Sequence, residues 1–315
     1  MSLRSHRQAG EKETKLSSTR DGIVARAPLA ADDETFASPG IILQCDKGIG
    51  TIVISRTDLQ NSLDVSAARA LRNAVHQCAN DMAVRVIVLR GADQVFCTGE
   101  DLSSIRAGGV AVEKNFPRQK HVKIWPGYGA FFRPILVYLH QTIVAMRNAQ
   151  KPVIAAVNGT VAGGGLGIAL ACDFIVASAR SLFDYSYCQT GLPGAAGVTF
   201  FLPKLIGIRR ALGLAFCPRR LTATEAYSLG LVSNVFADDE FDDHIEALVR
   251  TLATGPTETY AATKRLMNSA IGMDQLAEHL MREIEELTRA ADSEHFADEL
   301  KAACPRFATQ GAKLS

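Results

Sequence analysis

Apolar residues follow two different periods along the first two hundred positions. Five runs rich in aliphatic residues predict strands, at 41–45, 51–55, 84–89, 153–157 and 174–177. The first two flank the turn Asp46-Lys47-Gly48 and predict a hairpin. Three segments show helical spacing, at 64–80, 135–149 and 164–171. Strands that alternate with helices predict βαβ units and a largely parallel sheet, whose chemistry lies in loops beyond the strand C-termini.

Beyond Leu202 the pattern predicts helices only. Thr222 and Glu225 have the spacing of a capping box and predict the start of a short helix. Three amphipathic segments follow, at 238–254, 257–270 and 274–291. We therefore expect an α/β core at residues 40–200 and a helical C-terminal and oligomerisation region at 201–315.

One internal segment, Ala107–Pro134, fits no regular element well. It holds an aromatic stretch at 121–132. A long aromatic loop in a compact domain is either a functional lid or a mobile segment.

Charge and composition narrow the functions that remain. The 315 residues carry 34 Lys+Arg against 33 Asp+Glu, a net charge of +1, so no basic field is present to hold nucleic acid. No window offers the roughly 18 apolar residues of a membrane helix. Residues 1–39 are polar and aperiodic, and predict a disordered extension without a secretory signal. The seven cysteines fit neither a disulfide nor a metal framework and favour the cytoplasm.

Two loops could bind an oxyanion. Phe96–Leu102 follows a predicted strand, and Asn158–Gly167 is a glycine run between a strand and a helix. Such a run leaves backbone N–H groups free at the helix start, where the helix dipole also favours negative charge. The run is neither a dinucleotide fingerprint nor a P-loop. Glycine that allows close helix–strand packing is the alternative interpretation.

Together with the glycine turn 191–197, these loops resemble the crotonase (enoyl-CoA hydratase/isomerase) superfamily. The resemblance covers residues 40–307 and includes the motifs at 54–56, 61–63, 151–159, 202–207 and 221–226. It implies an α/β fold, a crotonase (ClpP-like) spiral of ββα units with a helical C-terminal trimerisation region. It also implies a lyase or isomerase, assembled as a homotrimer or a dimer of trimers. Its substrate would be an acyl-CoA, with coenzyme A as part of the thioester and no tightly bound cofactor.

The resemblance implies roles for individual residues. The backbone N–H groups of Glu100 and Gly164 match the two donors that hold the thioester oxygen as it gains enolate charge. Arg56, Asp101 and Gly163 match positions that bind the coenzyme A part. For Arg56 an ordinary surface arginine is the alternative.

The usual catalytic carboxylates are missing from the matching positions. Hydratases of the superfamily use two glutamates, where this chain has Gly167 and Tyr187. Other members place a carboxylate in the glycine turn, where this chain has Ala195. The hydratase interpretation is weakened, since activating a water needs a positioned base.

One subgroup is locally more similar. The stretches at 139–152, 162–168 and 207–211 look like 4-chlorobenzoyl-CoA dehalogenase, which has a histidine base at the position of His140 and an aromatic residue at that of Tyr187. Ala195 replaces its nucleophilic aspartate. His140 and Tyr187 are therefore catalytic candidates, although a packed core histidine is the alternative for His140. We expect an enzyme that stabilises a thioester enolate, on an aromatic or alicyclic acyl group. The alternatives are a catalytically reduced acyl-CoA-binding protein and an aroyl-CoA hydrolase or dehalogenase-like enzyme with an unusual catalytic set.

Overall fold

The computed structural model describes residues 40–115, 127–217 and 219–300. The predicted extension at 1–39 and residues 121–126 of the aromatic stretch lie outside the described residues, as does the end of the chain from residue 301.

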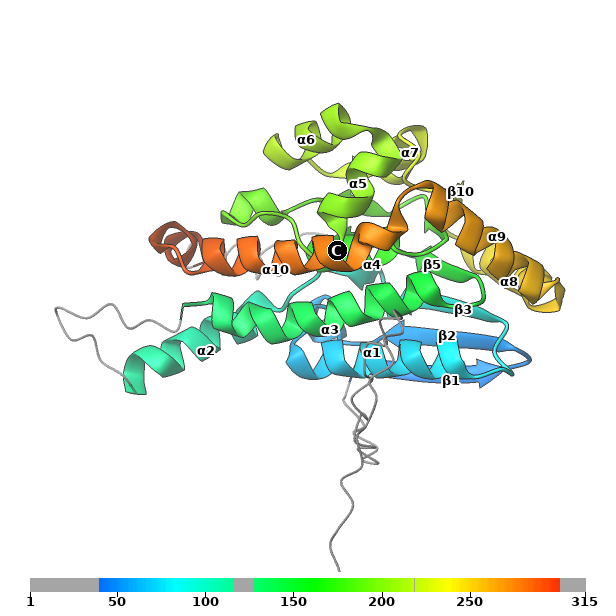
Figure 1. Ribbon diagram of the computed structural model, residues 1–315, viewed down its shortest axis with the longest axis horizontal. Coiled ribbons are helices and arrows are strands. Elements are labelled where there is room, and N and C mark those ends of the chain that lie inside the picture. The colour runs from blue at the N-terminus through cyan, green and yellow to red at the C-terminus, as the bar shows by residue number, and fades with distance from the viewer. Residues whose placement is uncertain (1–39, 116–126, 218, 301–315) are drawn as a thin grey trace, which may run out of the picture. The chain divides into compact units, whose positions relative to one another are not determined.

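The described strands form two sheets (Figure 1). The larger sheet has the order β1 (Ile41–Asp46), β2 (Ile49–Ile54), β3 (Val86–Gly91), β5 (Val153–Val157), β7 (Phe174–Ser178) and β10 (Asn234–Phe236). The smaller sheet has the order β4 (Val95–Cys97), β6 (Thr160–Ala162), β8 (Leu182–Asp184) and β9 (Leu221–Thr222). In the larger sheet β1 and β2 form the predicted antiparallel hairpin, and every other neighbouring pair is parallel.

The chain alternates between the two sheets as it advances. Strands β3, β5 and β7 are each followed directly by a strand of the smaller sheet, β4, β6 and β8. This repetition produces the expected spiral of ββα units. Because the strands of each sheet run parallel across the repeats, the turns that follow β4, β6 and β8 gather on one side of the fold.

Helices cover the sheets and extend the C-terminal half. Their bounds are α1 (Val65–Asn80), α2 (Leu102–Asn115), α3 (Gly129–Asn148), α4 (Gly163–Leu170), α5 (Val198–Ile206), α6 (Ile208–Phe216), α7 (Ala223–Ser228), α8 (Phe241–Thr254), α9 (Thr257–Ala270) and α10 (Leu276–Ala291). Three short 3-10 helices are η1 (Thr57–Leu59), η2 (Tyr187–Thr190) and η3 (Met273–Gln275). Helix α3 packs between α1 and α10, and the three run side by side (Figure 1). None of the described helices is long and apolar enough to cross a membrane.

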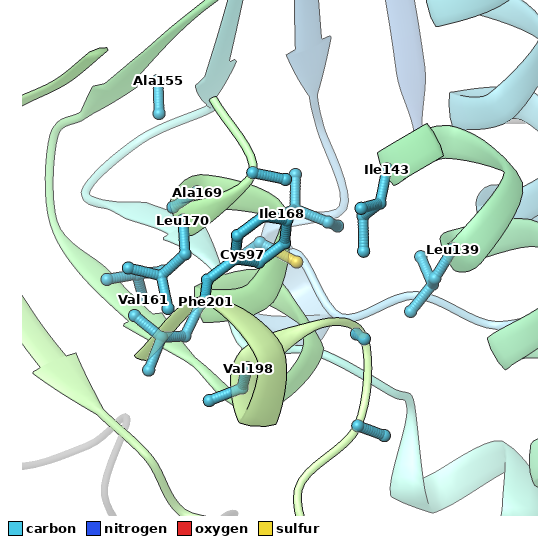
Figure 2. Packing of buried hydrophobic residues seen from close by; sticks show 14 of the residues in the cluster. Cys97, Leu139, Ile143, Ala155, Val161, Ile168, Ala169, Leu170, Val198 and Phe201 are labelled. Carbon is cyan, nitrogen blue, oxygen red and sulfur yellow. The ribbon is translucent and has the colours of Figure 1, made fainter. Parts of the chain in front are cut away.

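Side chains along each strand of the larger sheet alternate between its two faces, and both faces are packed against other residues. Ile87 and Leu89 belong to the main core, whereas Val86 and Val88 pack in a second cluster with residues of α8. Figure 2 shows the main core around Ile168 of α4, where side chains from α3, β4 and α5 meet. The glycine-rich helix α4 is thus buried at every position, which fixes the loop that precedes it.

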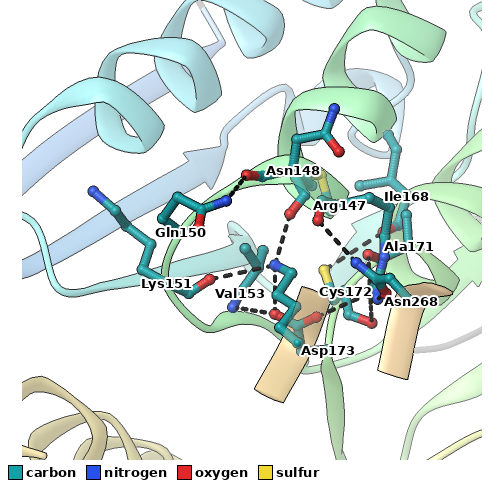
Figure 3. A network of polar contacts seen from close by, with 12 residues as sticks. Arg147, Asn148, Gln150, Lys151, Val153, Ile168, Ala171, Cys172, Asp173 and Asn268 are labelled. Carbon is teal, nitrogen blue, oxygen red and sulfur yellow. Dashed lines mark hydrogen bonds and ion pairs between the residues drawn. The ribbon is translucent and has the colours of Figure 1, made fainter. Parts of the chain in front are cut away.

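A partly buried polar network ties α9 (Thr257–Ala270) to α3 and the sheet (Figure 3). The Asp173 carboxylate pairs with Arg147 of α3 at 2.9 Å and with Lys264 of α9 at 2.7 Å. It also accepts the Val153 N–H at the start of β5, with a donor–acceptor distance of 2.9 Å. The partly buried carboxylate is tolerated here because two cations and an N–H donor compensate its charge.

Two predictions about regular structure are wrong. The prediction that only helices follow Leu202 is wrong, because β9 is a strand of the smaller sheet and β10 is a strand of the larger one. These strands have two and three residues, too few for an alternating pattern to show in the sequence. The segment Ala107–Pro134 does contain regular structure, since α2 extends to Asn115 and α3 begins at Gly129. The glycines of α2 and Pro134 of α3 weaken the helical signal. The capping box of Thr222 and Glu225 is confirmed.

Candidate functional site

A cavity of about 500 Å³ lies where the loops after β4, β6 and β8 come together. Glu100 and Asp101 line it from the first loop, Gly163 from the second, and Tyr187 from the third. The structure therefore brings four of the predicted site residues to one wall, although they are far apart in the sequence.

Backbone pairing orients the first loop. Leu63 donates its N–H to the Gly99 carbonyl oxygen at 2.7 Å and accepts the Asp101 N–H at 3.0 Å. Successive residues of an extended segment direct their backbone groups to opposite sides. The N–H of Glu100, between these two, therefore faces away from Leu63 and toward the start of α4.

Glycine is required where the two loops approach each other. Gly99 has φ +87°, and a Cβ there would lie 2.6 Å from the backbone nitrogen of Gly164. A side chain at that position would both strain the backbone and block the N–H of Gly164. Gly164 is the second residue of α4, so its N–H has no partner within the helix.

The side chain of Glu100 lies on these backbone donors. Its Oε2 accepts the Gly164 N–H at 3.3 Å, and its own backbone N–H also hydrogen-bonds the carboxyl. The residue is 8% exposed. Burial raises the pKa of Glu100, and the hydrogen bonds from its own N–H, Tyr187 and Gly164 oppose that rise. Both predicted oxyanion donors thus converge on one acidic group.

Tyr187 completes the environment of this carboxyl. Its phenol donates to Oε1 of Glu100 at 3.0 Å, and its ring packs edge-on against Tyr185. Burial and the neighbouring Glu100 raise the pKa of Tyr187 well above its ordinary value. The phenol is therefore a permanent hydrogen-bond donor at neutral pH, facing the cavity.

The positions that lack carboxylates are closed by packing. A Cβ at Gly167 would lie 1.9 Å from the carbonyl oxygen of Ala196, and Ala195 is fully buried. The turn at 194–197 thus occupies the space that a side chain at position 167 would need. Position 167 cannot accept a carboxylate unless this turn moves.

A second buried carboxylate, Glu283 of α10, lies behind the turn. It accepts the N–H groups of Gly197 at 2.8 Å and Thr199 at 3.2 Å, together with the Thr199 hydroxyl. These donors form the start of α5, so Glu283 caps that helix from a distant part of the chain. Burial raises its pKa to about 7.

His140 belongs to this second cluster and not to the cavity wall. Its Nε2 lies 3.7 Å from a Glu283 carboxylate oxygen, beyond hydrogen-bond distance, and is buried without a partner among the described residues. Burial, together with the charge of His279, lowers the pKa of His140 to about 4. Its predicted acid/base role stays a prediction.

Arg56 also lies away from the cavity wall. Its guanidinium pairs with Asp64 at 2.7 Å and with Asp101 at 3.6 Å, and donates to the Ser62 carbonyl oxygen at 2.5 Å. Its side chain is 10% exposed. Asp101 in turn caps α2 through the N–H of Ser103 at 3.0 Å. In this arrangement Arg56 orders the first loop, and its contact with coenzyme A stays a prediction.

Sequence reasoning missed three side chains. For Glu100 the sequence assigns a role to the backbone N–H and places the side chain in the presumed pocket without a role. Glu283 lies in an ordinary amphipathic helix, and Arg220 has no motif around it. Arg220 is the one cationic residue among the described groups that line the cavity, and it contacts Asp184 at 3.3 Å. The described residues contain no cluster of three or more His, Cys, Asp or Glu side chains suited to a metal ion.

Comparison with known proteins shows the family to which this fold belongs. The sequence matches the profile described as enoyl-CoA hydratase/isomerase over residues 44–126 and 137–307. The 4-chlorobenzoyl coenzyme A dehalogenase-2 of Arthrobacter sp. is 30% identical over 255 residues, which are 80% of this chain and 86% of that protein. The 1,2-epoxyphenylacetyl-CoA isomerase of Escherichia coli K12 is 30% identical over 232 residues, which are 73% of this chain and 82% of that protein.

The solved structures agree with the sequence comparison. The crystal structure of an enoyl-CoA hydratase from Mycobacterium avium subsp. paratuberculosis K-10 matches with a TM-score of 0.72 at 28% identity. That match covers 88% of this chain and 100% of the other. The chain therefore belongs to the enoyl-CoA hydratase/isomerase family, also called the crotonase superfamily.

Proposed function

We propose that the protein is an acyl-CoA thioester enzyme that stabilises a thioester enolate at the N–H groups of Glu100 and Gly164. The observation that carries the proposal is the convergence of these two donors on one acidic group, the Glu100 carboxyl. A developing enolate oxygen presents the same negative charge at the same place. Fixed N–H donors in a buried site stabilise such charge strongly because they need no reorganisation during the reaction.

The acyl group that we propose is aromatic or alicyclic. Phe132, Tyr187 and Leu192 give the cavity apolar walls, and a volume of about 500 Å³ suits a ring. Two relatives carry acyl groups with a six-membered ring in their names, the 4-chlorobenzoyl-CoA dehalogenase and the 1,2-epoxyphenylacetyl-CoA isomerase. Coenzyme A enters as part of the substrate, with no tightly bound cofactor, and Arg220 on the wall supplies a positive charge for its phosphates.

We expect a lyase or isomerase reaction, because both proceed through the gain or loss of a proton at the α-carbon. Tyr187 and His140 are the proton-handling candidates from the sequence, and Tyr187 is the one on the cavity wall. A dehalogenase route requires an aspartate that attacks the aryl ring. This chain has Ala195 at the matching position, so that route lacks its nucleophile.

The oxyanion role can be tested by removing one N–H group. Gly164→Pro deletes the donor, and Gly164→Ala keeps it while adding the same first side-chain carbon. Loss of one donor costs about 2.7–4 kcal/mol of transition-state stabilisation, or 10²–10³-fold in turnover. We expect Gly164→Pro to lose turnover by this factor over a panel of enoyl-CoA and aroyl-CoA thioesters. Gly164→Ala should lose turnover by less than a tenth of that factor. Thermal midpoints check that both variants fold. Equal turnover in the two variants would exclude the N–H of Gly164 as an oxyanion donor.

A catalytically reduced acyl-CoA-binding protein is the second candidate. It is favoured by the Glu100 carboxyl on the donors and by the closed positions at Gly167 and Ala195. Calorimetry distinguishes the two functions. Binding of acyl-CoA without turnover of any panel member supports the second candidate, whereas turnover that depends on the Gly164 N–H supports the first.

We also propose that the protein assembles as a homotrimer or a dimer of trimers through its C-terminal helices. Ile208, Leu212 and Phe216 form an exposed stripe on α6 at intervals of four residues, and Leu266 and Met267 are exposed on α9. Large apolar side chains exposed together are typical of interfaces. Light scattering should give a mass three or six times that of one chain, and Phe216→Glu should reduce it. A monomeric wild-type protein would exclude this assembly.

A further inference from the structure

The carboxyl of Glu100 and a thioester carbonyl need the same two hydrogen-bond donors. Oε2 of Glu100 accepts the Gly164 N–H, and the N–H of Glu100 itself is the other donor. A backbone N–H in a helix start has one hydrogen to donate. If the proposed function holds, a bound carbonyl oxygen must therefore displace the Glu100 carboxyl from these groups.

The displaced carboxyl cannot move far, because it is attached to one of the two donor residues. A glutamate carboxylate stays within roughly 6 Å of its own backbone nitrogen in any rotamer. A carbonyl oxygen held by that nitrogen at about 2.9 Å places the adjacent α-carbon within roughly 5 Å of it. The two groups are thus confined to the same small region of the cavity.

We propose that the side chain of Glu100 is the catalytic carboxylate of this site, displaced from the oxyanion donors by the thioester carbonyl and held beside the α-carbon as its proton acceptor. This inference rests on the proposed function and adds to it the acid/base group that the usual family positions lack. It assigns to the Glu100 side chain a role separate from that of its backbone N–H.

The proton transfer balances without any further reactant. The Cα–H bond breaks, and its proton forms an O–H bond on the Glu100 carboxylate. The electron pair of the broken bond moves into the C–C bond, and the carbonyl electrons move to oxygen, where the N–H groups of Glu100 and Gly164 hold the enolate. The protonated Glu100 then returns the proton to the α-carbon or to another carbon of the acyl group.

The other carboxylates of the cavity wall are engaged differently. Asp101 caps α2 and pairs with Arg56, and Asp184 contacts Arg220. Asp58 is exposed on η1. Of the described acidic side chains on the wall, Glu100 alone contacts an oxyanion donor in the structure.

Burial favours the neutral acid at Glu100, whereas the hydrogen bonds that its carboxyl accepts favour the carboxylate. Tyr187 from η2 donates to it. Burial raises the pKa of Cys97 of β4 and of Glu283 of α10, and the nearby charge of Glu100 adds a smaller rise to each. Its chain neighbour Asp101 is compensated by Arg56. No ion pair joins a cation to Glu100 among the described residues. Its raised pKa makes the carboxylate a stronger base than an exposed glutamate once it has lost its proton.

The test measures exchange of α-protons for deuterium in D₂O, with butyryl-CoA and phenylacetyl-CoA as probes. NMR gives the exchange rate and calorimetry gives the Kd of the same probes. Glu100→Gln preserves the shape but accepts no proton, so we expect a loss of at least about 10²-fold in exchange with a Kd within about threefold. Glu100→Ala should lose exchange equally but bind the probes more tightly, because nothing competes for the donors.

Two further measurements separate catalysis from a structural role. Added acetate should restore part of the exchange in Glu100→Ala, whose missing carboxylate leaves space, and not in Glu100→Gln. The exchange rate of the wild-type protein should rise with pH as Glu100 loses its proton, and this profile should vanish in Glu100→Gln. Glu286→Gln, at an exposed glutamate of α10 that does not line the cavity, is the control and should keep the wild-type rate.

The outcomes distinguish this inference from the proposed function. Wild-type exchange that survives in Glu100→Gln overturns the role of Glu100 and leaves the oxyanion hole intact. Binding without exchange in the wild-type protein overturns it as well and favours the acyl-CoA-binding candidate. A wild-type protein that binds none of the thioesters overturns the proposed function itself.

Discussion

Two buried carboxylates, Glu100 and Glu283, have similar partners and different surroundings. Each accepts N–H groups at the start of a helix, Glu100 at α4 and Glu283 at α5, and burial raises the pKa of each. Glu283 is enclosed between α5 and α10, with three donors on it. Glu100 borders a cavity of about 500 Å³.

The difference shows that a raised pKa alone does not mark a catalytic group. A carboxylate that is enclosed by backbone donors stabilises the end of a helix, because those donors would otherwise be buried without acceptors. A carboxylate that borders open volume can be replaced by a ligand atom at the same donors. The predictions below test whether Glu283 and Glu100 separate in this way.

The largest expected effect is the loss of stability on removing the enclosed carboxylate. Glu283→Ala leaves the N–H groups of Gly197 and Thr199 buried without acceptors, so we expect the free energy of unfolding to fall by about 3–5 kcal/mol. Urea unfolding measures it. Glu286→Ala, an exposed glutamate on the same helix paired with Arg289, should cost about 0.5 kcal/mol. Glu100→Ala should cost less than about 1 kcal/mol, and an equal loss for Glu100 and Glu283 would remove the contrast.

The second effect is the dependence of stability on pH. The pKa of Glu283 is about 7 in the folded protein, above its ordinary value of 4.5, so the folded chain binds more protons between these values. Its stabilising neutral form is fully present below about pH 4.5 and is lost as pH rises through about 7. The shift corresponds to about 3 kcal/mol.

The measurement is the difference in unfolding free energy between wild type and Glu283→Gln from pH 4.5 to 8. The pKa of His140 is lowered to about 4. This group therefore makes the free energy of unfolding rise with pH below about pH 6.5 in both proteins. The difference curve therefore isolates Glu283. A curve that is flat across this range would contradict the raised pKa.

The third effect concerns the phenol that contacts Glu100. Tyr187→Phe removes the hydrogen bond to Oε1, and we expect turnover to fall by about 10²-fold, which is about 2.7 kcal/mol. Tyr185→Phe is the control, since Tyr185 packs against Tyr187 without contacting Glu100. The measurement compares the steady-state rates of the two variants with the best thioester of the panel. Similar rates for the two variants would show that the Tyr187 hydroxyl plays no part.

The smallest effect is expected at His140, in the enclosed cluster. Its Nε2 is buried without a hydrogen bond, so His140→Leu should change the unfolding free energy by no more than about 1 kcal/mol. Turnover should stay within about threefold of wild type. A loss of about 10²-fold in a folded variant would instead support the acid/base role predicted from the sequence.

The regular elements with a strong period were predictable, and the weakest ones were not. The strand at 153–157 has the predicted bounds, and the helix predicted at 64–80 forms over Val65–Asn80. Strands β9 and β10 were missed because their pairing partners, β8 and β7, define them more than their own residues do. A strand of two or three residues exists through its neighbours and carries no period of its own.

Resemblance to a known family implied the spiral of ββα units, and the sequence by itself determined the two glycine-containing loops. These are local properties, because a glycine that permits close approach and a free N–H at a helix start depend on the residues in that stretch. Tertiary structure alone decided where the side chains of these loops point. It placed the Glu100 carboxyl on the donors of its own site, and it brought Glu283 to Gly197 across 86 positions. Such contacts arise when distant elements pack together, and no local pattern encodes them.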